Sequence, residues 1–360
     1  MDGKEDKRIE RYLLQSVARK AIPKERVAKC FRRRLPSQNA HVWKHLKTEK
    51  CFYGGLTVCG SLWTCPVCAA KISERRRTEL KQALGYFKQE GGRVAMLTLT
   101  FSHKFDDKLS DTIVRFQKAI ERLRSGKRYK LLMDKLGLIG TIRSMEITYG
   151  INGFHPHVHI LYLYENKVVL KEIEKVFFDL WLLACKANDL TTQEQYGAKF
   201  EDGKKADGYV SKWGLEEEVT KSHSKKGRNG GLTPFDFLRM YVEIEDEKYL
   251  RLFEEYAHAT KSKRQLTWSK GLKDRFLIEE KSDEDLAQEK TEQADLLGEI
   301  DYDTWKWILR LEKRGEFLRM VEQNGFESAY EIFYEDYLDG YDLENKKSPD
   351  RAHGSKGHTK

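Results

Sequence analysis

The segment from Gly153 to Leu163 (GFHPHVHILYL) places two histidines on either side of one apolar residue, at the start of an apolar run. Because the side chains of a strand alternate between its two faces, His157 and His159 are predicted to project from one side while Val158 points into a core. Two imidazoles on one face form part of a metal site that stays open to water or substrate. The segment therefore predicts a half-buried strand with a partial metal site; the alternative is a strand whose solvated face is simply polar.

The charge distribution indicates a polyanionic partner. The chain has 360 residues and a net charge of +9, with basic runs at 32–34, 75–77, 122–130 and 221–228 and an acidic stretch at 277–301. A positive excess of this kind usually indicates nucleic acid, although solvated helix faces also carry such runs. No apolar run approaches the roughly 20 residues that span a bilayer, and the first residues lack the apolar core of a signal peptide. We therefore expect a cytoplasmic protein without a membrane partner.

Three of the six cysteines lie close together as Cys59, Cys65 and Cys68. A Cys-x-x-Cys pair lets two thiolates bind one tetrahedral zinc ion, and disulfides are not expected in a reducing compartment. A fourth ligand has to come from upstream, where both Cys30 and Cys51 are candidates. A redox pair is the alternative interpretation.

Apolar periodicity predicts the order strand–helix–strand–strand–helix–strand in the middle of the chain. The predicted strands are 94–101, 138–149, 157–164 and 198–200, and the predicted helices between them are one capped by Ser110-Asp111 and one at 170–185. This is the order of a split βαβ, ferredoxin-like antiparallel sheet, so we expect an α+β fold. Outside this region, the predictions are helices at 71–91, 208–219, after Thr233-Pro234, at 303–322 and at 327–338, and a solvated helix or linker at 277–301.

Glu146 is the expected third ligand of the metal site. A turn at 151–153 joins its strand to the histidine strand and brings Glu146 beside the two histidines. One carboxylate with two imidazoles suits Mn²⁺ or Mg²⁺. The alternatives are that Glu146 is an exposed strand residue, or that His155 replaces it, although Pro156 disturbs the strand geometry there.

A metal of this kind polarises a phosphoryl oxygen but supplies no nucleophile, which a tyrosine beside a lysine would provide. The pattern Tyr-x-x-Lys occurs at Tyr164, Tyr196 and Tyr209. Only Tyr209 and Lys212 fall on a predicted helix, where residues three apart share a face. Tyr209 is therefore the favoured nucleophile, and Tyr196 is the second candidate.

Three motifs, Leu97-Thr-Leu-Thr100, His155-Pro-His-Val-His159 and Tyr209-Val-Ser-Lys212, occur in one order along the chain. In this order they resemble the rolling-circle plasmid replication initiators, the Rep proteins of the HUH endonuclease superfamily, and the likeness covers roughly residues 30–280. The resemblance implies a ferredoxin-like HUH domain that follows a small zinc-binding segment and precedes a helical C-terminal region. The expected divisions are a basic arm (1–29), a zinc-binding segment and helix (30–91), the nicking domain (92–240), the helical region (241–345) and a disordered tail (346–360).

The resemblance also implies an activity, a metal-dependent nick in one strand of a plasmid origin. Tyr209 would attack the scissile phosphate, leaving a 5′-phosphotyrosyl link and a 3′-OH primer, with assistance from Lys212. His157, His159 and Glu146 would hold Mn²⁺ or Mg²⁺. The resemblance favours Cys30 over Cys51 as the fourth zinc ligand, beside Cys59, Cys65 and Cys68.

The implied partners are single-stranded or cruciform origin DNA, a host helicase and a polymerase. The basic residues expected to contact the DNA backbone are Lys225, Lys226 and Arg228. Two alternatives remain open: a transposase or relaxase of the same superfamily, and a non-catalytic, zinc-containing DNA-binding regulator.

Overall fold

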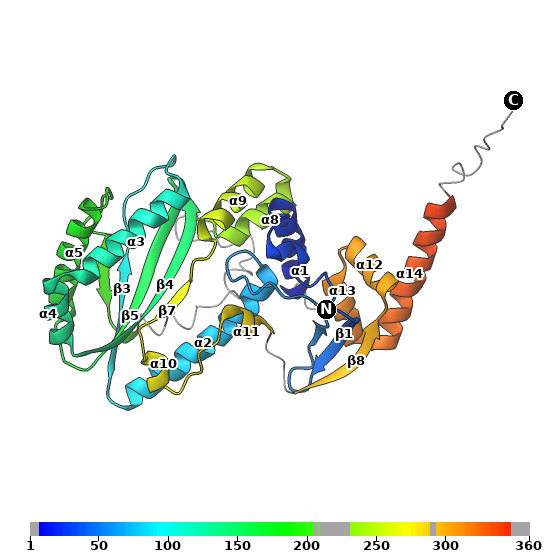
Figure 1. The fold of residues 1–360 in the computed structure, drawn as a ribbon, viewed down its shortest axis with the longest axis horizontal. Helices are drawn as coiled ribbons and strands as arrows, with labels where there is room; N and C mark the ends of the chain where they lie inside the picture. Colours follow the sequence, from blue (N-terminus) through cyan, green and yellow to red (C-terminus); the bar gives the residue numbers. More distant parts are fainter. Residues whose placement is uncertain (1–6, 205–207, 209–230, 289–292, 347–360) are drawn as a thin grey trace, which may run out of the picture. The chain divides into compact units, whose positions relative to one another are not determined.

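The computed structural model describes residues 7–204, 208, 231–288 and 293–346 (Figure 1). The predicted nucleophile Tyr209, its neighbour Lys212 and the basic residues Lys225, Lys226 and Arg228 lie outside the described residues. The predicted helix at 208–219, apart from residue 208, and the tail from residue 347 lie outside them as well. The chain divides into two compact units: unit 1 contains 1–13, 29–57 and 290–360, and unit 2 contains 14–28 and 58–289.

The secondary structure mixes helices with short and long strands. The strands are β1 (Ala40–His45), β2 (Cys51–Gly54), β3 (Arg93–Leu99), β4 (Leu138–Gly150), β5 (Gly153–Tyr164), β6 (Ala198–Glu201), β7 (Leu266–Trp268) and β8 (Ala294–Ile300). The helices are α1 (Lys7–Ala21), the 3₁₀ turn η1 (Arg26–Lys29), α2 (Pro66–Gln89), α3 (Leu109–Ser125), α4 (Lys127–Leu136), α5 (Leu170–Lys186), α8 (Pro234–Ile244), α9 (Lys248–Thr260), α10 (Leu272–Arg275), α11 (Asp283–Gln288), α12 (Tyr302–Arg310), α13 (Arg314–Asn324) and α14 (Phe326–Lys346).

Unit 2 is built on a five-stranded sheet with the order β6-β3-β5-β4-β7. All of its pairings are antiparallel. β3 and β4, the strands joined by the first helical connection, are separated by β5, which is the split βαβ arrangement. The predicted α+β fold with an antiparallel, ferredoxin-like sheet is therefore confirmed, and β7 extends it beyond β4.

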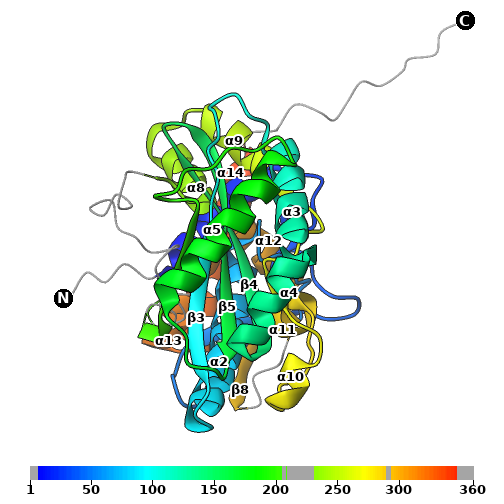
Figure 2. The same ribbon diagram turned by 90° about the vertical axis from the view of Figure 1, so that its left-hand side faces the viewer.

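The helices α3, α4 and α5 cover one face of this sheet (Figures 1 and 2). Val158 and Ile160 of β5 point into the core beneath them, together with Leu97 of β3. On the opposite face, α2 packs against the part of β5 that carries Leu161 and Leu163. Because side chains two apart share a face, His157 and His159 continue this second face beyond the hydrophobic core made with α2.

Two local expectations need correction. Ser110 and Asp111 do not cap α3, since the helix begins at Leu109 and its N-cap residue is Lys108. β5 begins at Gly153 rather than at His157 and contains Pro156. This proline is tolerated because β3 ends at Leu99, opposite Val158, so Pro156 is paired only with β4.

Unit 1 contains a smaller antiparallel sheet with the order β2-β1-β8. Its strand β8 comes from the acidic stretch, for which the sequence predicts a solvated helix or a linker, and the same stretch also contains α11. The expectation is wrong for residues 294–300, because pairing of β8 with β1 stabilises a strand whose acidic residues Asp295 and Glu299 are exposed. The predicted helix at 303–322 is two helices, α12 and α13, which pack their buried residues Trp305 and Phe317 into the core of this unit.

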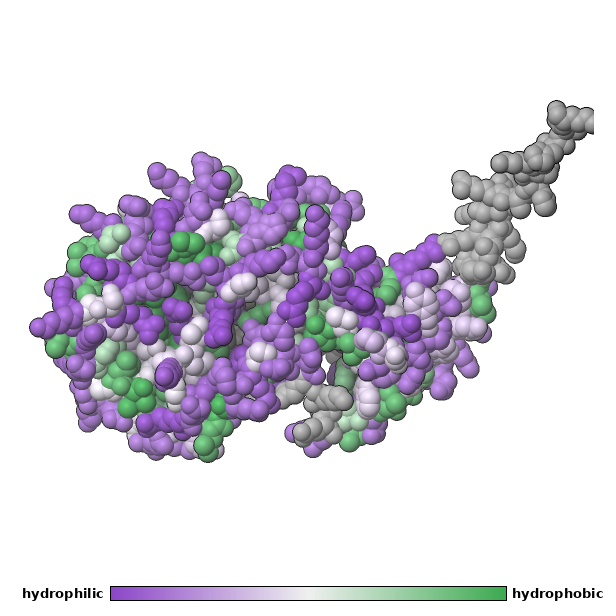
Figure 3. All heavy atoms as spheres, in the orientation of Figure 1, coloured by the Kyte–Doolittle hydropathy of each residue, from purple (hydrophilic) through white to green (hydrophobic). Residues whose placement is uncertain are grey.

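The face of the molecule drawn in Figure 3 is mainly polar. Figure 3 shows hydrophilic residues over most of one face, with apolar residues in small scattered patches. Within the described ranges, none of the helices has both the length and the apolar character needed to cross a membrane.

Candidate functional site

Three predicted metal ligands meet on the second face of the unit 2 sheet. The register of the β4–β5 hairpin pairs Glu146 directly with His157. The Glu146 Oε2 atom lies 3.3 Å from Nε2 of His157 and 3.7 Å from Nε2 of His159. The predicted placement of the two histidines on one face, with the carboxylate beside them, is thus what the structure shows.

The Nδ1 atoms of both imidazoles each have a hydrogen-bonding partner. Thr98 Oγ1 of β3 lies 2.9 Å from His159 Nδ1, and the carbonyl oxygen of His155 lies 3.3 Å from His157 Nδ1. A carbonyl oxygen only accepts hydrogen bonds, so this contact favours a proton on Nδ1 of His157. These contacts leave Nε2 of each ring directed at the carboxylate, as metal-binding histidines require.

Burial keeps the His159 imidazole neutral. Burial, together with the charge of a protonated His157 and against the attraction of the Glu146 carboxylate, lowers the pKa of His159 to about 4. Metal ions bind the unprotonated imidazole, so His159 is ready to bind a cation at neutral pH.

The three residues fit a divalent cation. Their ligand atoms all lie within 4.8 Å of one another, and each side chain is half-buried rather than sealed in the core. Octahedral coordination at about 2.1 Å separates neighbouring ligand atoms by about 3 Å, so small side-chain adjustments suffice. A site of two imidazoles and one carboxylate leaves positions open for phosphate oxygens or water.

His155 belongs to a different contact. Its Nδ1 atom lies 3.2 Å from Nδ1 of His103, although its ring stacks on that of His157 with centroids 5.4 Å apart. Burial, together with the neighbouring His157 and His103, lowers the pKa of His155 to about 3. His155 therefore lies outside the group of three residues that could hold a metal ion, and Glu146 is its third member.

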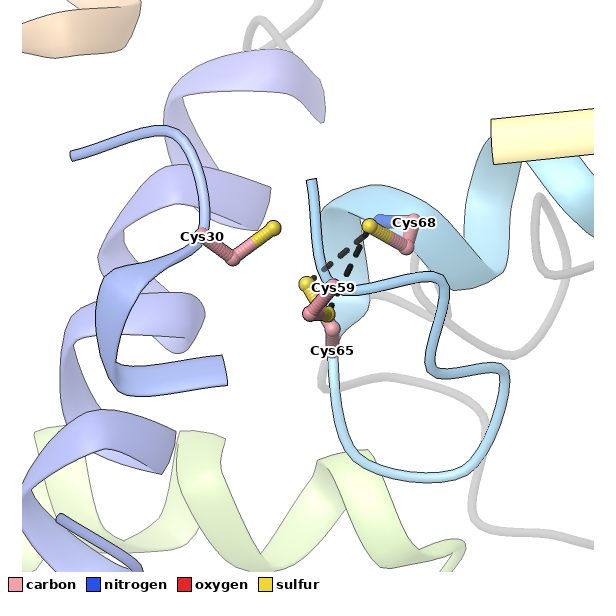
Figure 4. A group of neighbouring side chains, drawn as sticks. All are labelled: Cys30, Cys59, Cys65 and Cys68. Atoms are coloured by element: carbon pink, nitrogen blue, oxygen red, sulfur yellow. Dashed lines mark hydrogen bonds between the residues drawn. The ribbon is translucent and has the colours of Figure 1, made fainter. Parts of the chain in front are cut away.

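The four predicted zinc ligands also come together. Cys30, Cys59, Cys65 and Cys68 are buried, and their Sγ atoms lie within 4.8 Å of one another (Figure 4). The Sγ atoms of Cys59 and Cys68 are 3.6 Å apart, close to the separation of about 3.8 Å between thiolates on a tetrahedral zinc ion. This buried cluster could hold a structural metal, and Cys51 lies outside it.

Hydrogen-bond donors surround two of these sulfurs. The backbone N–H groups of Ser61 and Cys68 donate to Cys59 Sγ and Cys65 Sγ at 3.4 and 3.5 Å. Gln15, which is almost completely buried in α1, donates from Nε2 to Cys65 Sγ at 3.0 Å. Such donors stabilise the charge of thiolates that bind a metal.

Residues 57–316 match the family described as "Replication protein". The chain belongs to this family. The matched range contains both the histidine–carboxylate cluster and three of the four clustered cysteines.

Two relatives from Streptomyces extend the comparison. The chain is 26% identical over 289 residues to "Protein rep" of Streptomyces lividans, a match covering 61% of this chain and 63% of that protein. It is 33% identical over 134 residues to "Neomycin resistance protein" of Streptomyces cyanogenus, covering 30% of this chain and 31% of that protein. The chain thus spans less than two thirds of the length of either relative. No solved structure matches it significantly.

For this replication protein, sequence reasoning assigns no role to Thr98, Gln15 or His103. Thr98 lies within the motif Leu97-Thr-Leu-Thr100, whose alternation of leucine and threonine is the one signal that could have pointed to a functional strand face. The other tyrosines of the repeated pattern lie apart from each other: Tyr164 is buried at the end of β5, whereas Tyr196 is exposed, with Lys199 Nζ 5.7 Å from its ring centroid.

Proposed function

We propose that this replication protein initiates rolling-circle replication of a plasmid by nicking one strand at the origin. The observation that carries the proposal is the Glu146 carboxylate facing Nε2 of both His157 and His159 on an open sheet face. Membership of the replication protein family supports the same assignment. A divalent cation held by these three residues would polarise a non-bridging phosphate oxygen and stabilise charge on the leaving oxygen.

Tyr209 is the proposed nucleophile, on the strength of its motif. Its phenolate oxygen attacks the scissile phosphorus and forms a phosphotyrosyl ester with the 5′ end of the fragment downstream of the nick. The bond from phosphorus to the 3′ oxygen breaks, and this oxygen takes up a proton to become the 3′-OH primer. Lys212 favours the phenolate and neutralises phosphate charge.

The remaining assignments follow from the same proposal. Lys225, Lys226 and Arg228 contact the backbone of single-stranded or cruciform origin DNA, and the exposed 3′-OH requires a host helicase and polymerase. After one round, a second strand transfer closes the displaced circle. The four clustered cysteines hold a structural Zn²⁺, which suits their burial and their all-sulfur donor set.

The test is a covalent-adduct assay with a labelled single-stranded origin oligonucleotide and Mn²⁺, analysed on a denaturing gel. Wild-type protein is expected to give a shifted protein–DNA band. Tyr209→Phe is expected to give none, because phenylalanine has no hydroxyl to attack phosphorus. Tyr196→Phe is the matched control and should keep the adduct.

Other outcomes would contradict the assignment. An adduct that survives Tyr209→Phe but not Tyr196→Phe would move the nucleophile to Tyr196. A folded, metal-loaded protein that binds origin DNA without any adduct would be a non-catalytic regulator. Cleavage of a mobile-element end or transfer origin, but not of the replication origin, would indicate a transposase or relaxase.

A further inference from the structure

Unit 1 contains a hollow of about 870 Å³ that no part of the proposed nicking chemistry uses. It is formed where the run Arg32-Arg33-Arg34 faces α12, and its wall includes Tyr302 and Lys306. We call this hollow the basic groove, defined by Arg33, Arg34, Tyr302 and Lys306.

The charge of the basic groove is largely uncompensated. Arg32 donates two hydrogen bonds of 2.8 Å to the Glu312 carboxylate. Within the described part of the chain, no carboxylate pairs with Arg33, Arg34 or Lys306. The one acid among the described lining residues is Glu299, which lies 3.4 Å from His41 Nε2. The groove therefore presents three cations to a ligand.

Neighbouring groups hold two of these cations in place. The guanidinium of Arg34 lies 4.6 Å from the centroid of the Tyr302 ring, and Lys306 Nζ lies 5.2 Å from it. Arg34 Nη1 also donates to Asn39 Oδ1 at 2.8 Å. Cations positioned on an aromatic ring lose less conformational entropy on binding an anion than free side chains do.

The groove also has a rigid base. Trp305 of α12 is buried, and its Nε1 donates to the carbonyl oxygen of Arg32 at 2.9 Å. This hydrogen bond connects α12 directly to the basic run, so the cations contributed by the two segments keep their spacing. A rigid array of arginine and lysine suits repeated phosphates, because guanidinium groups bind phosphate oxygens in pairs.

We infer that the basic groove binds backbone phosphates of nucleic acid and gives this protein a second DNA contact besides its nicking site. Tyr302 has cations beside its ring, which favours phosphate contact over base stacking, so binding is expected to be independent of sequence. The choice of DNA as the polyanion rests on the proposed function. The phosphate chemistry is shared by duplex and single-stranded DNA.

The test compares two charge-matched double variants of the full chain. Arg33→Gln/Lys306→Gln removes two exposed groove cations, and Lys47→Gln/Arg319→Gln removes one arginine and one lysine that are exposed in unit 1 outside the groove lining. Affinity for a random-sequence duplex, and for one of its strands, is measured over a series of salt concentrations. For the groove variant, the slope of log affinity against log salt should become shallower by about 1 for each phosphate that the variant no longer neutralises. The control variant should keep the wild-type slope.

The two DNA forms identify the source of the phosphates. If the salt slope changes only with the duplex, the groove binds duplex DNA. If it changes only with the single strand, the groove binds the displaced strand. Arg33→Lys/Lys306→Arg, which keeps both charges, should restore the wild-type slope. Unchanged slopes for the groove variant with both DNA forms, or equal changes in the control variant, would overturn the inference.

A separate readout distinguishes this inference from the proposed function. Adduct formation is measured at low salt with a saturating short origin oligonucleotide, and the groove variant should match wild type. If wild type forms no adduct while the groove variant still shows the shallower slope, the nicking proposal fails and the basic groove remains. If adducts form normally and the slopes do not differ, the groove inference fails alone.

Discussion

Thr98 is the residue whose position most directly sets the orientation of a proposed metal ligand. It lies opposite His159 in the β3–β5 register, and its hydroxyl contacts His159 Nδ1 at 2.9 Å. Thr98→Val keeps the shape of the side chain but removes this contact, so the ring is no longer held with Nε2 toward Glu146. We expect affinity for Mn²⁺ to fall by about 10- to 100-fold, measured by calorimetric titration.

Two variants make this prediction specific. Thr98→Ser retains a hydroxyl and should keep most of the affinity. Thr100→Val removes another threonine of the same motif, whose Oγ1 donates to the carbonyl oxygen of Tyr196 and does not contact the histidines, so it should bind Mn²⁺ as wild type does. Equal Mn²⁺ affinity for Thr98→Val and wild type would show that the contact does not orient the ligand.

The same residues show how far the sequence can predict the site. The side on which His157 and His159 project follows from strand alternation, and the position of Glu146 follows from a hairpin with a short turn. Both depend on residues near each other in sequence. The contact of Thr98 depends on which strand lies beside β5 and in which register, and a single sequence does not specify either.

At the scale of elements, the start of α2 coincides with the cysteine cluster. Cys65 is the N-cap residue of α2 and Cys68 lies in its first turn, so the Cys-x-x-Cys pair and the helix terminus form together. Cys30→Ala should reduce the zinc content measured on the purified protein and lower its melting temperature, because a four-sulfur site loses one ligand. Cys51→Ala is the matched control and should retain the zinc.

A chain with Cys51→Ala that loses its zinc while Cys30→Ala keeps it would reverse the ligand assignment. The sequence alone leaves this choice open, since both cysteines precede the other three. What decides it in the structure is that Cys51 lies in β2, where its backbone N–H donates to Glu322 Oε1 at 2.6 Å, outside the sulfur cluster.

Elements formed by distant segments are the ones that the sequence predicts poorly. The strands β3, β4, β5 and β6 follow apolar patterns that predict them, whereas β8 has an acidic composition that indicates a linker. Its partner β1 lies about 250 positions earlier in the chain, in a region without clear periodicity. Pairing across such a separation is a tertiary effect that local composition does not encode.

At the scale of the whole molecule, the proposed DNA binding and the proposed DNA cleavage depend on groups of opposite charge. The net charge of +9 and the cations of the basic groove would attract phosphates, whereas Glu146 is an acid whose carboxylate faces two histidines. Removing one negative charge should not weaken attraction to a polyanion. The two properties should therefore respond differently to the same substitution.

Glu146→Gln is the variant that tests this separation. It should reduce adduct formation by about 100-fold or more, because a metal site that loses its carboxylate gives up several kcal/mol of charge stabilisation. Its affinity for random-sequence duplex should remain within about twofold of wild type, since the phosphate contacts that dominate binding are intact.

Removal of divalent cations from the wild-type protein with a chelator should also abolish adduct formation and leave duplex affinity unchanged. Added Mn²⁺ should then restore adduct formation by the wild-type protein but not by the variant. If the variant instead lost duplex affinity together with cleavage, the cluster would be part of the DNA-binding surface, and the open sheet face would not be a separate catalytic centre.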